Sequence, residues 1–259
     1  MRVGVVGAAG RMGAETCRAI DAAEGLELVA AVSPSHAGQR LSDLVGVDTE
    51  IVVSSDLDAL TQAGCDVAVE FTGPDTVGAN LLGILEREMH AVVGATGFDD
   101  ADLARAAALA GSGPANALIA PNFAIGAVLM MRFAEQAARY LPHVEIVEQH
   151  HDRKVDAPSG TALRTADLIA RAREEIPDAP GGDDAHPGAR GALHANVRIH
   201  SVRLPGLIAH QETIFGGQGQ TLTLRHDSLD RSSFMPGVVL ACQRVGELDG
   251  LVIGLEHLL

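Results

Sequence analysis

The 259-residue sequence predicts an α/β protein with two domains. In the first half, short apolar runs alternate with segments whose apolar residues recur at helical spacing, which is typical of a parallel sheet covered by helices on both faces. In the second half, strand-like runs follow one another without intervening helices, which indicates an α+β domain with an open mixed sheet. We therefore expect one domain over residues 1–122, completed by residues 231–259, and a second domain over residues 123–230.

Charge and composition exclude several classes of protein. Acidic residues outnumber Lys and Arg by 34 to 19, and no basic run is present, so we expect neither nucleic acid nor a membrane surface as a partner. Cys17, Cys65 and Cys242 are odd in number and widely spaced, without a C-x-x-C motif. This cysteine usage, together with an N-terminus that starts directly with a strand-like run, predicts reduced thiols and a cytoplasmic location.

Five short apolar runs are the expected strands of the first sheet. Their length and composition suit buried parallel strands. In sheets of this kind, ligands bind beyond the carboxyl ends of the strands, so the segments that follow these runs are the expected ligand site. The runs cover residues 2–6, 26–32, 67–71, 91–93 and 117–120.

The first of these runs leads into the sequence G-A-A-G-R-M-G, from Gly7 to Gly13, and then into a helical stretch. Glycines at a strand-to-helix turn let the backbone approach a pyrophosphate, whose charge meets the helix N-terminus. The spacing is G-x-x-G-x-x-G rather than G-x-G-x-x-G, and such a turn could also serve flavin or methyl-donor binding, or tight packing alone. Its position between a strand and a helix favours a Rossmann-like dinucleotide-binding domain.

The second run ends at Ser33, where an NAD-binding domain usually carries an acidic residue that holds the ribose hydroxyls. Because no carboxylate here would repel a 2′-phosphate, and Arg11 lies in the glycine-rich turn, we expect NADPH to be accepted, alone or alongside NADH. The alternative is that backbone contacts replace the acidic residue and NADH dominates. Residues 94–97 and 120–123 follow two later runs, where a nicotinamide would rest, although loops of this composition are often only turns.

The most informative stretch is E-Q-H-H-D-R-K-V-D-A-P-S-G-T-A, residues 148–162. Lys154 is the one lysine among 19 Lys and Arg residues, and lysine, unlike arginine, can transfer a proton or fill a compact anion site. Chance retention on a solvated loop is the alternative. The adjacent His150 and His151 would point to opposite faces if a strand continues through them. Adjacent histidines suit zinc poorly, so we expect no metal.

A helix is expected to begin at the end of this stretch and to run to Arg173, with Ser159 or Thr161 as its cap. The amides of Gly160 and Thr161 would then bind a carboxylate at the positive end of the helix dipole. The alternative is an ordinary capped helix start without a ligand. Residues 177–193, rich in Pro, Gly and Asp, are expected to form a mobile loop.

Three strand-like runs follow, at residues 197–201, 207–215 and 222–224. A sheet with so few covering helices needs another layer over its open face. We therefore expect the chain to self-associate across this sheet.

The stretch 148–162 resembles the signature of the 4-hydroxy-tetrahydrodipicolinate reductase (dihydrodipicolinate reductase) family of lysine biosynthesis. Other segments fit the same family, so the resemblance covers essentially the whole chain. They are V-G-V-V-G-A-A-G-R-M-G at 3–13, V-G-A-T-G-F at 93–98, A-P-N-F at 120–123, S-V-R-L-P-G at 201–206, A-H-Q-E at 209–212, G-Q-T-L-T-L-R-H-D-S at 219–228 and G-L-E-H at 254–257.

The resemblance implies NAD(P)H-dependent reduction of a cyclic dicarboxylate, 4-hydroxy-tetrahydrodipicolinate, to tetrahydrodipicolinate, by a homotetramer assembled through the C-terminal sheet. His150 would be the catalytic proton donor and acceptor, and Lys154 the proton donor. His151 and the amides of Gly160 and Thr161 would bind the substrate. The residues implied to bind NADPH or NADH are Gly7, Ala8, Ala9, Gly10, Arg11, Met12, Ser33, Gly94, Ala95, Thr96, Ala120, Pro121, Asn122 and Phe123.

Three positions depart from the pattern of the family. Ser33 replaces a frequent acidic residue, Ala95 replaces a common threonine, and Glu70 stands where aspartate is usual. Two other functions are kept as alternatives: another two-domain NAD(P)-dependent oxidoreductase, and a sensor that binds NAD(P)H without turnover. Another two-domain oxidoreductase is not expected to carry both histidines, the lysine and the S-G-T helix start, although reductases of this fold group that lost the lysine-pathway activity could retain much of this signature. The intact proton-transfer pair argues against a sensor.

Overall fold

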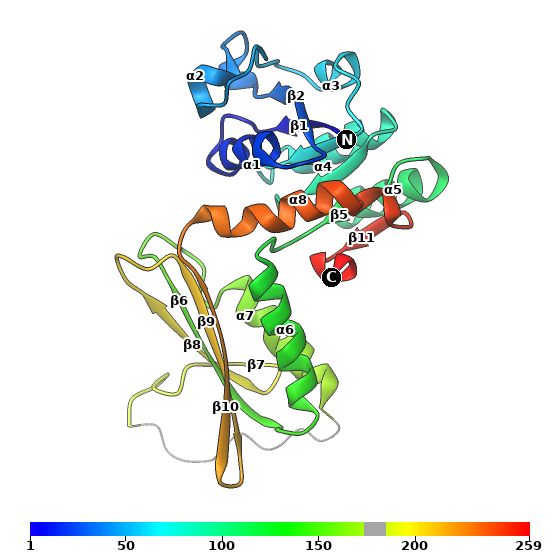
Figure 1. Cartoon of the computed structure of the whole chain (residues 1–259). Coiled ribbons are helices and arrows are strands. Elements are labelled where there is room, and N and C mark those ends of the chain that lie inside the picture. The colour runs from blue at the N-terminus through cyan, green and yellow to red at the C-terminus, as the bar shows by residue number, and fades with distance from the viewer. Residues whose placement is uncertain (174–184) are drawn as a thin grey trace. The chain divides into compact units, whose positions relative to one another are not determined.

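The computed structural model describes residues 1–173 and 185–259 (Figure 1). The chain divides into two compact units, Met1–Ile125 with Phe234–Leu259, and Gly126–Ser233. The C-terminal segment therefore belongs to the same unit as the N-terminal half. Of the loop expected over residues 177–193, the part up to residue 184 lies outside the described residues.

The first unit is built on a six-stranded sheet of order β11-β5-β4-β3-β1-β2, in which all neighbouring strands are parallel. This confirms the expected Rossmann-like architecture. The last strand, β11, is not among the expected strands. The strands are β1 (Arg2–Val6), β2 (Glu27–Val32), β3 (Val67–Glu70), β4 (His90–Val93), β5 (Ala117–Ile119) and β11 (Leu251–Ile253).

Helices cover both faces of this sheet, with α1 packed against α8 and α4 packed against α5. The core under α4 and α5 includes Ala68 of β3, Leu81 of α4 and Ala106 of α5, all fully buried. The start of α5 follows from Asp99, whose carboxylate accepts a hydrogen bond from the Asp102 amide at 2.7 Å. The helices are α1 (Arg11–Ala22), α2 (Leu41–Val45), α3 (Asp58–Gln62), α4 (Val77–Glu86), α5 (Asp100–Ser112) and α8 (Met235–Arg244), with short 3-10 helices at Pro34–His36, Val245–Glu247 and Leu255–Leu258. A further 3-10 helix, Arg231–Phe234, lies at the boundary of the two units.

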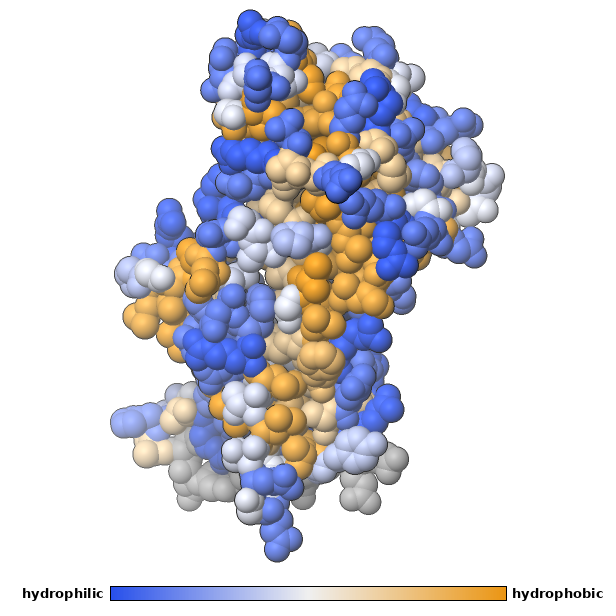
Figure 2. All heavy atoms as spheres, in the orientation of Figure 1, coloured by the Kyte–Doolittle hydropathy of each residue, from blue (hydrophilic) through white to orange (hydrophobic). Residues whose placement is uncertain are grey.

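The second unit contains a five-stranded sheet of order β10-β9-β6-β8-β7. Its β6–β8 pair is parallel and its other pairs are antiparallel, which confirms the expected mixed sheet. Helices α6 and α7 cover one face, over a core that includes Ile146, Ile169 and Phe215. Figure 2 shows apolar side chains at the surface over α6, where Phe133 is 50% exposed. The elements are α6 (Ile125–Ala138), β6 (His143–His150), α7 (Gly160–Ala172), β7 (Ala192–His194), β8 (Val197–Arg203), β9 (Ala209–Gly217) and β10 (Gln220–Ser228).

The strand β7 begins at Ala192, before the expected end of the loop at residue 193. It forms a tight hairpin with β8, in which His194 pairs with Val197. The two residues between them, Ala195 and Asn196, have φ values of 48° and 58°. Positive φ at both central residues is the geometry of a type I′ turn, which matches the twist of the two strands. Pairing across this turn therefore extends the sheet into the expected loop.

The other face of the second sheet is not covered by a helix in the described residues. Along β9, Gln211, Thr213 and Phe215 are buried towards the helices, whereas the alternate residues His210, Glu212 and Ile214 lie on the open face. An open face of this kind is the feature from which self-association was expected.

Candidate active site

The carboxyl edge of the first sheet is shaped by glycines. Gly7, directly after β1, has a φ of +82°, and a Cβ there would lie 2.7 Å from the Phe71 carbonyl oxygen. A Cβ on Gly13 would lie 2.1 Å from the Gly7 carbonyl oxygen. Both distances are below any normal contact, so the turn and the first turn of α1 pack too closely for side chains. The expected glycine-rich turn is therefore required by the packing around it.

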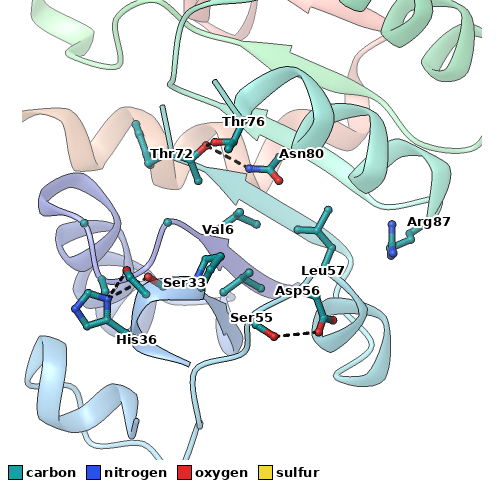
Figure 3. A pocket seen from close by; sticks show the side chains of 17 residues that line it. Val6, Ser33, His36, Ser55, Asp56, Leu57, Thr72, Thr76, Asn80 and Arg87 are labelled. Atoms are coloured by element: carbon teal, nitrogen blue, oxygen red, sulfur yellow. Dashed lines mark hydrogen bonds between the residues drawn. The ribbon is translucent and has the colours of Figure 1, made fainter. Parts of the chain in front are cut away.

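A cavity of about 620 Å³ opens beside this turn (Figure 3). Among the expected cofactor-binding residues, Gly7, Ala9, Gly10 and Ser33 line it. The helix α1 starts at the cavity with Gly10 as its N-cap, and no side chain caps its first amides. A close backbone turn with an uncapped helix start fits the phosphates of a dinucleotide. The other lining residues are Val6, Val32, Pro34, Ser35, His36, Ser55, Asp56, Leu57, Phe71, Thr72, Thr76, Asn80 and Arg87.

Three other expected residues of the turn lie outside the cavity lining. Ala8 is fully buried and contributes packing. Arg11 and Met12 occupy the first turn of α1 without lining the cavity. The loop after β2 supplies Ser33 as expected, but also Ser35 and His36, whose Oγ and Nδ1 atoms are 2.9 Å apart. The sequence hypothesis did not assign a role to Ser35, His36 or Asp56.

The two later loops continue the same edge of the sheet. Gly94–Thr96 follows β4 and Ala120–Phe123 follows β5, and neither lines the cavity described above. Phe71, directly after β3, connects them. A Cβ on Gly94 would lie 2.1 Å from the Phe71 ring. The Phe71 and Phe123 rings meet edge to face with centroids 5.7 Å apart. The intermediate positions, Ala95, Thr96, Pro121 and Asn122, lie within these loops.

In the second unit, a carboxylate organises the end of β6. Glu148 and His150 are two residues apart and therefore lie on the same side of the strand. The Glu148 side chain is fully buried, and its Oε2 is 2.5 Å from Nδ1 of His150. Arg203 donates to both carboxylate oxygens at 2.8 Å, and the Ser159 amide donates to Oε1 at 3.2 Å. One carboxylate thus joins the ends of β6 and β8 to the start of α7.

The charge on Glu148 decides how His150 is protonated. Burial alone would raise the pKa of this carboxyl, but hydrogen bonds from His150 and Arg203 outweigh it and lower the pKa to about 2. An ionised carboxylate can only accept, so the proton of the short contact lies on Nδ1 of His150. The other ring nitrogen, Nε2, is thereby left to exchange a proton with a ligand.

The turn after β6 carries His151 and Lys154. Because β6 ends at His150, the alternation considered for the two histidines does not extend to His151. The Lys154 amide donates to the His151 carbonyl at 3.2 Å. The Lys154 ammonium is 2.8 Å from both carboxylate oxygens of Asp156. The backbone carbonyl of Asp156 accepts a hydrogen bond from Arg203 at 2.7 Å. Arg203 therefore ties the lysine-bearing turn to the Glu148–His150 pair.

The helix α7 begins at Gly160, and Ser159 is its cap, because the Ser159 hydroxyl accepts from the Ala162 amide at 3.2 Å. Thr161 lies inside the first turn. A Cβ on Gly160 would meet no atom within 4 Å, so the backbone at the helix start is open to a ligand. Glu148 contacts His150 and accepts from the Ser159 amide, so one carboxylate links the end of β6 to the start of α7.

The sequence analysis did not predict a functional role for Glu148, Asp156 or Arg203. Strand parity alone could have found Glu148, because it lies two residues before His150. Arg203 is different. It faces His150 in the parallel register of β6 and β8, which no local pattern reveals.

The described residues hold neither a metal-binding cluster nor a membrane-spanning helix. No group of three His, Cys, Asp or Glu side chains within residues 1–173 and 185–259 is placed to hold a metal ion. No described helix is long and apolar enough to cross a membrane.

Comparison with known proteins identifies the family. Residues 1–123 match the family model "Dihydrodipicolinate reductase, N-terminus" and residues 126–259 match "Dihydrodipicolinate reductase, C-terminus". The chain is 51% identical to the 4-hydroxy-tetrahydrodipicolinate reductase of Nocardia farcinica, over 100% of this chain and 98% of that protein. It is 46% identical to the enzyme of the same name from Bacillus pumilus, with the same coverage.

Solved structures agree with this result. Dipicolinate-bound dihydrodipicolinate reductase from Paenisporosarcina sp. TG-14 is 42% identical, with a TM-score of 0.87 over 100% of this chain and 99% of that chain. An amine dehydrogenase from Mycobacterium smegmatis shares the fold alone, at 17% identity and a TM-score of 0.69 over 97% of this chain and 94% of that chain. The chain belongs to the dihydrodipicolinate reductase family.

Proposed function

We propose that this chain reduces 4-hydroxy-tetrahydrodipicolinate to tetrahydrodipicolinate in the diaminopimelate and lysine pathway, using a nicotinamide nucleotide. The first unit is the pyridine-nucleotide-binding domain of the family, and the relatives named above are oxidoreductases for this substrate. The observation that carries the proposal is the pair that the buried Glu148 forms with His150, together with the open start of α7. An imidazole that exchanges a proton and a helix terminus that binds a carboxylate, both linked to Glu148, support this reaction.

Each residue has a distinct task in the proposed reaction. NAD(P)H, when bound, supplies a hydride, the substrate takes up one proton, and its 4-hydroxyl group leaves as water. His150 exchanges a proton through Nε2, while Glu148 holds the ring by Nδ1. Lys154 donates a proton and attracts the dianionic substrate. A cation about 4 Å from a carboxylate contributes about 4 kcal/mol at an effective dielectric near 20, so the lysine can exchange Asp156 for a substrate carboxylate at little net loss.

His151, Gly160 and Thr161 are proposed to bind the substrate. The helix α7 is 13 residues long, so its N-terminus carries the partial positive charge of the helix dipole. The space beside Gly160 lets a carboxylate approach that terminus. His151 follows His150 directly and is held by its amide, which donates to the Ile208 carbonyl at 3.4 Å.

The decisive experiment is a coupled assay with synthase-generated substrate, followed at the nicotinamide absorbance band. We expect oxidation of the nucleotide that depends on the substrate. Binding of NAD(P)H without such oxidation would contradict the reductase function and favour the sensor alternative. Turnover with a different carbonyl or imine substrate alone would favour another oxidoreductase.

We also propose that NADPH is accepted alongside NADH. Ser33 lines the cavity and is accompanied by the hydroxyl of Ser35 and the imidazole of His36, which can all donate to a 2′-phosphate. The nearest acidic group in the lining, Asp56, already accepts hydrogen bonds from the Asp58 amide at 3.0 Å and the Ser55 hydroxyl at 3.3 Å.

A comparison of kcat/KM for NADPH and NADH tests this cofactor proposal. Ser33→Asp should lower kcat/KM for NADPH by about tenfold or more, because the added carboxylate repels the 2′-phosphate, and should leave NADH within a few-fold. Absence of NADPH turnover in the unsubstituted protein would contradict the proposal.

The proposed assembly is a homotetramer in the cytoplasm. Its support is the open face of the second sheet, where ion pairs such as Glu145–His200, with atoms 2.7 Å apart, lie beside the apolar Ile214. The described cysteines are all free thiols, as in a reducing compartment. Sedimentation should give the mass of four chains, and a stable monomer under assay conditions would contradict the assembly. Cell fractionation checks the location.

A further inference from the structure

A second fully buried carboxyl group lies in the first unit and has no part in the reaction above. Glu70 ends β3 and is 0% exposed. Its Oε1 accepts hydrogen bonds from the Thr72 amide at 3.0 Å, from the Asn80 side-chain amide at 3.1 Å and from the Thr72 hydroxyl. Its Oε2 is buried without a hydrogen-bond partner among the described residues.

The two residues that donate to Glu70, Thr72 and Asn80, form one wall of the nucleotide cavity together with Thr76. Thr72, Thr76 and Asn80 all line that cavity, and Figure 3 shows their side chains turned towards one another. The Thr76 hydroxyl donates to the Thr72 hydroxyl at 2.8 Å, and Asn80 reaches the same oxygen at 3.2 Å. Glu70 shares the strand face of Ala68, under α4, so it lies directly behind this wall and does not reach the cavity itself.

Stability does not explain a carboxyl group at this position. Burial raises the pKa of Glu70, although hydrogen bonds from Thr72 and Asn80 oppose the rise, so placing this group in the core is unfavourable. An apolar side chain of similar volume would fill the same space at no such cost, and such replacements of buried charged groups are often neutral or stabilising. What an apolar side chain cannot do is accept three hydrogen bonds.

We propose that Glu70 is a positioning residue for the pyridine nucleotide, which holds the polar atoms of Thr72, Thr76 and Asn80 in the orientation that the nucleotide contacts. The carboxyl group acts through these three residues and never touches the ligand. This inference rests on the nucleotide-binding function proposed for the cavity. The residues at the end of β3 and the start of α4 then contribute to the affinity for the nucleotide. Glu70 has no role in proton transfer.

Glu70→Leu tests the inference, because it keeps the volume and removes all three acceptor bonds. Without these bonds Thr72 and Asn80 are no longer held in place, which should raise the Kd and KM for NADPH about tenfold, while kcat at saturating nucleotide stays within about threefold. Glu70→Gln should restore Kd to within about threefold, because the amide oxygen accepts the same bonds. Kd is measured by calorimetry with NADPH and NADH, without substrate. If Glu70→Leu does not fold, Glu70→Met replaces it, because its unbranched side chain fills the same space.

Asn116→Leu is the matched control. Asn116 precedes β5 at the opposite edge of the same sheet, and its side chain makes three hydrogen bonds, to the Val245 carbonyl at 3.2 Å, the Gly246 carbonyl at 3.3 Å and the Gly250 amide at 3.2 Å. Its loss should lower the unfolding temperature and leave Kd within about twofold.

The outcomes separate the two proposals. A Kd for Glu70→Leu equal to that of the unsubstituted protein, or a rise no larger than that of Asn116→Leu, would overturn the positioning role alone. Failure of Glu70→Gln to recover binding would do the same. An unsubstituted protein that binds neither NADPH nor NADH would overturn the proposed function, and this inference with it.

Discussion

Replacing Glu148 by glutamine should inactivate the enzyme without changing the shape of its site. The substitution removes one charge and almost no volume. In the structure, Oε2 of Glu148 accepts from His150 and Arg203, and Oε1 accepts from Arg203 and the Ser159 amide. Glutamine has one acceptor oxygen and one NH2 group. Whichever carboxylate oxygen the NH2 group replaces, it faces two hydrogen-bond donors and cannot accept from them. If it faces His150, the proton moves from Nδ1 to Nε2, and the imidazole presents the wrong tautomer to the substrate.

The structure sets the size of the effect. Breaking a buried ion pair on one side leaves the Arg203 charge without its partner and costs about 3–5 kcal/mol of unfolding free energy. A correctly protonated acid–base residue contributes a factor of about 10²–10⁴, so we expect kcat to fall by at least about 100-fold. The nucleotide cavity is lined by residues of the first unit only, and therefore the Kd for NADPH should stay within about twofold.

The assay is nucleotide oxidation at saturating substrate and NADPH, combined with urea unfolding and with calorimetry for NADPH. Asp167→Asn is the matched control. Asp167 also pairs with a histidine of the second unit, His194, at 2.8 Å, but its side chain is 50% exposed. Loss of an exposed pair should cost less than about 1 kcal/mol and leave kcat within about twofold.

A folded Glu148→Gln protein whose kcat stays within threefold of the original would refute the reasoning. The carboxylate would then serve only to hold β6, β8 and α7 together. A loss of NADPH affinity equal to the loss of rate would refute it as well, because the charge would then act on the nucleotide.

Other predictions concern the lysine, the glycine turn and acid stability. Lys154→Met should lose kcat by orders of magnitude and still bind NADPH, as measured by steady-state kinetics and calorimetry; near-normal turnover would contradict its role. Gly13→Ala places a Cβ 2.1 Å from the Gly7 carbonyl oxygen and should lower unfolding free energy by at least about 2 kcal/mol, whereas Gly111→Ala, with no atom within 4 Å, should be neutral or slightly stabilising. Because the folded pKa of Glu148 is lowered from 4.5 to about 2, its stabilising effect should be complete above pH 4.5 and lost as pH falls towards 2. The difference in urea stability between the original protein and Glu148→Gln should therefore shrink by about 3 kcal/mol across that range, and a constant difference would contradict the low pKa.

Much of the fold and part of the site follow from local patterns in the sequence. Buried parallel strands are near-continuous apolar runs, and a glycine-rich turn between a strand and a helix needs only neighbouring residues to be recognised. Both histidines, the lysine and the helix start can be recognised in the stretch 148–162, because they lie close together in the chain. Whether Ser159 or Thr161 caps α7 stays open from the sequence, since either hydroxyl can accept an amide proton.

Contacts between distant segments were decided by the tertiary structure alone. Arg203 lies 55 residues beyond Glu148, and only the parallel register of β6 with β8 places it opposite His150. Glu70 shows its role only once α4 is packed over β3, with Asn80 above the carboxyl group. The spacing of apolar residues over a short stretch of chain indicates which face of a helix or strand is buried. It carries no information on which strand lies alongside, because strand pairing depends on how the whole sheet packs.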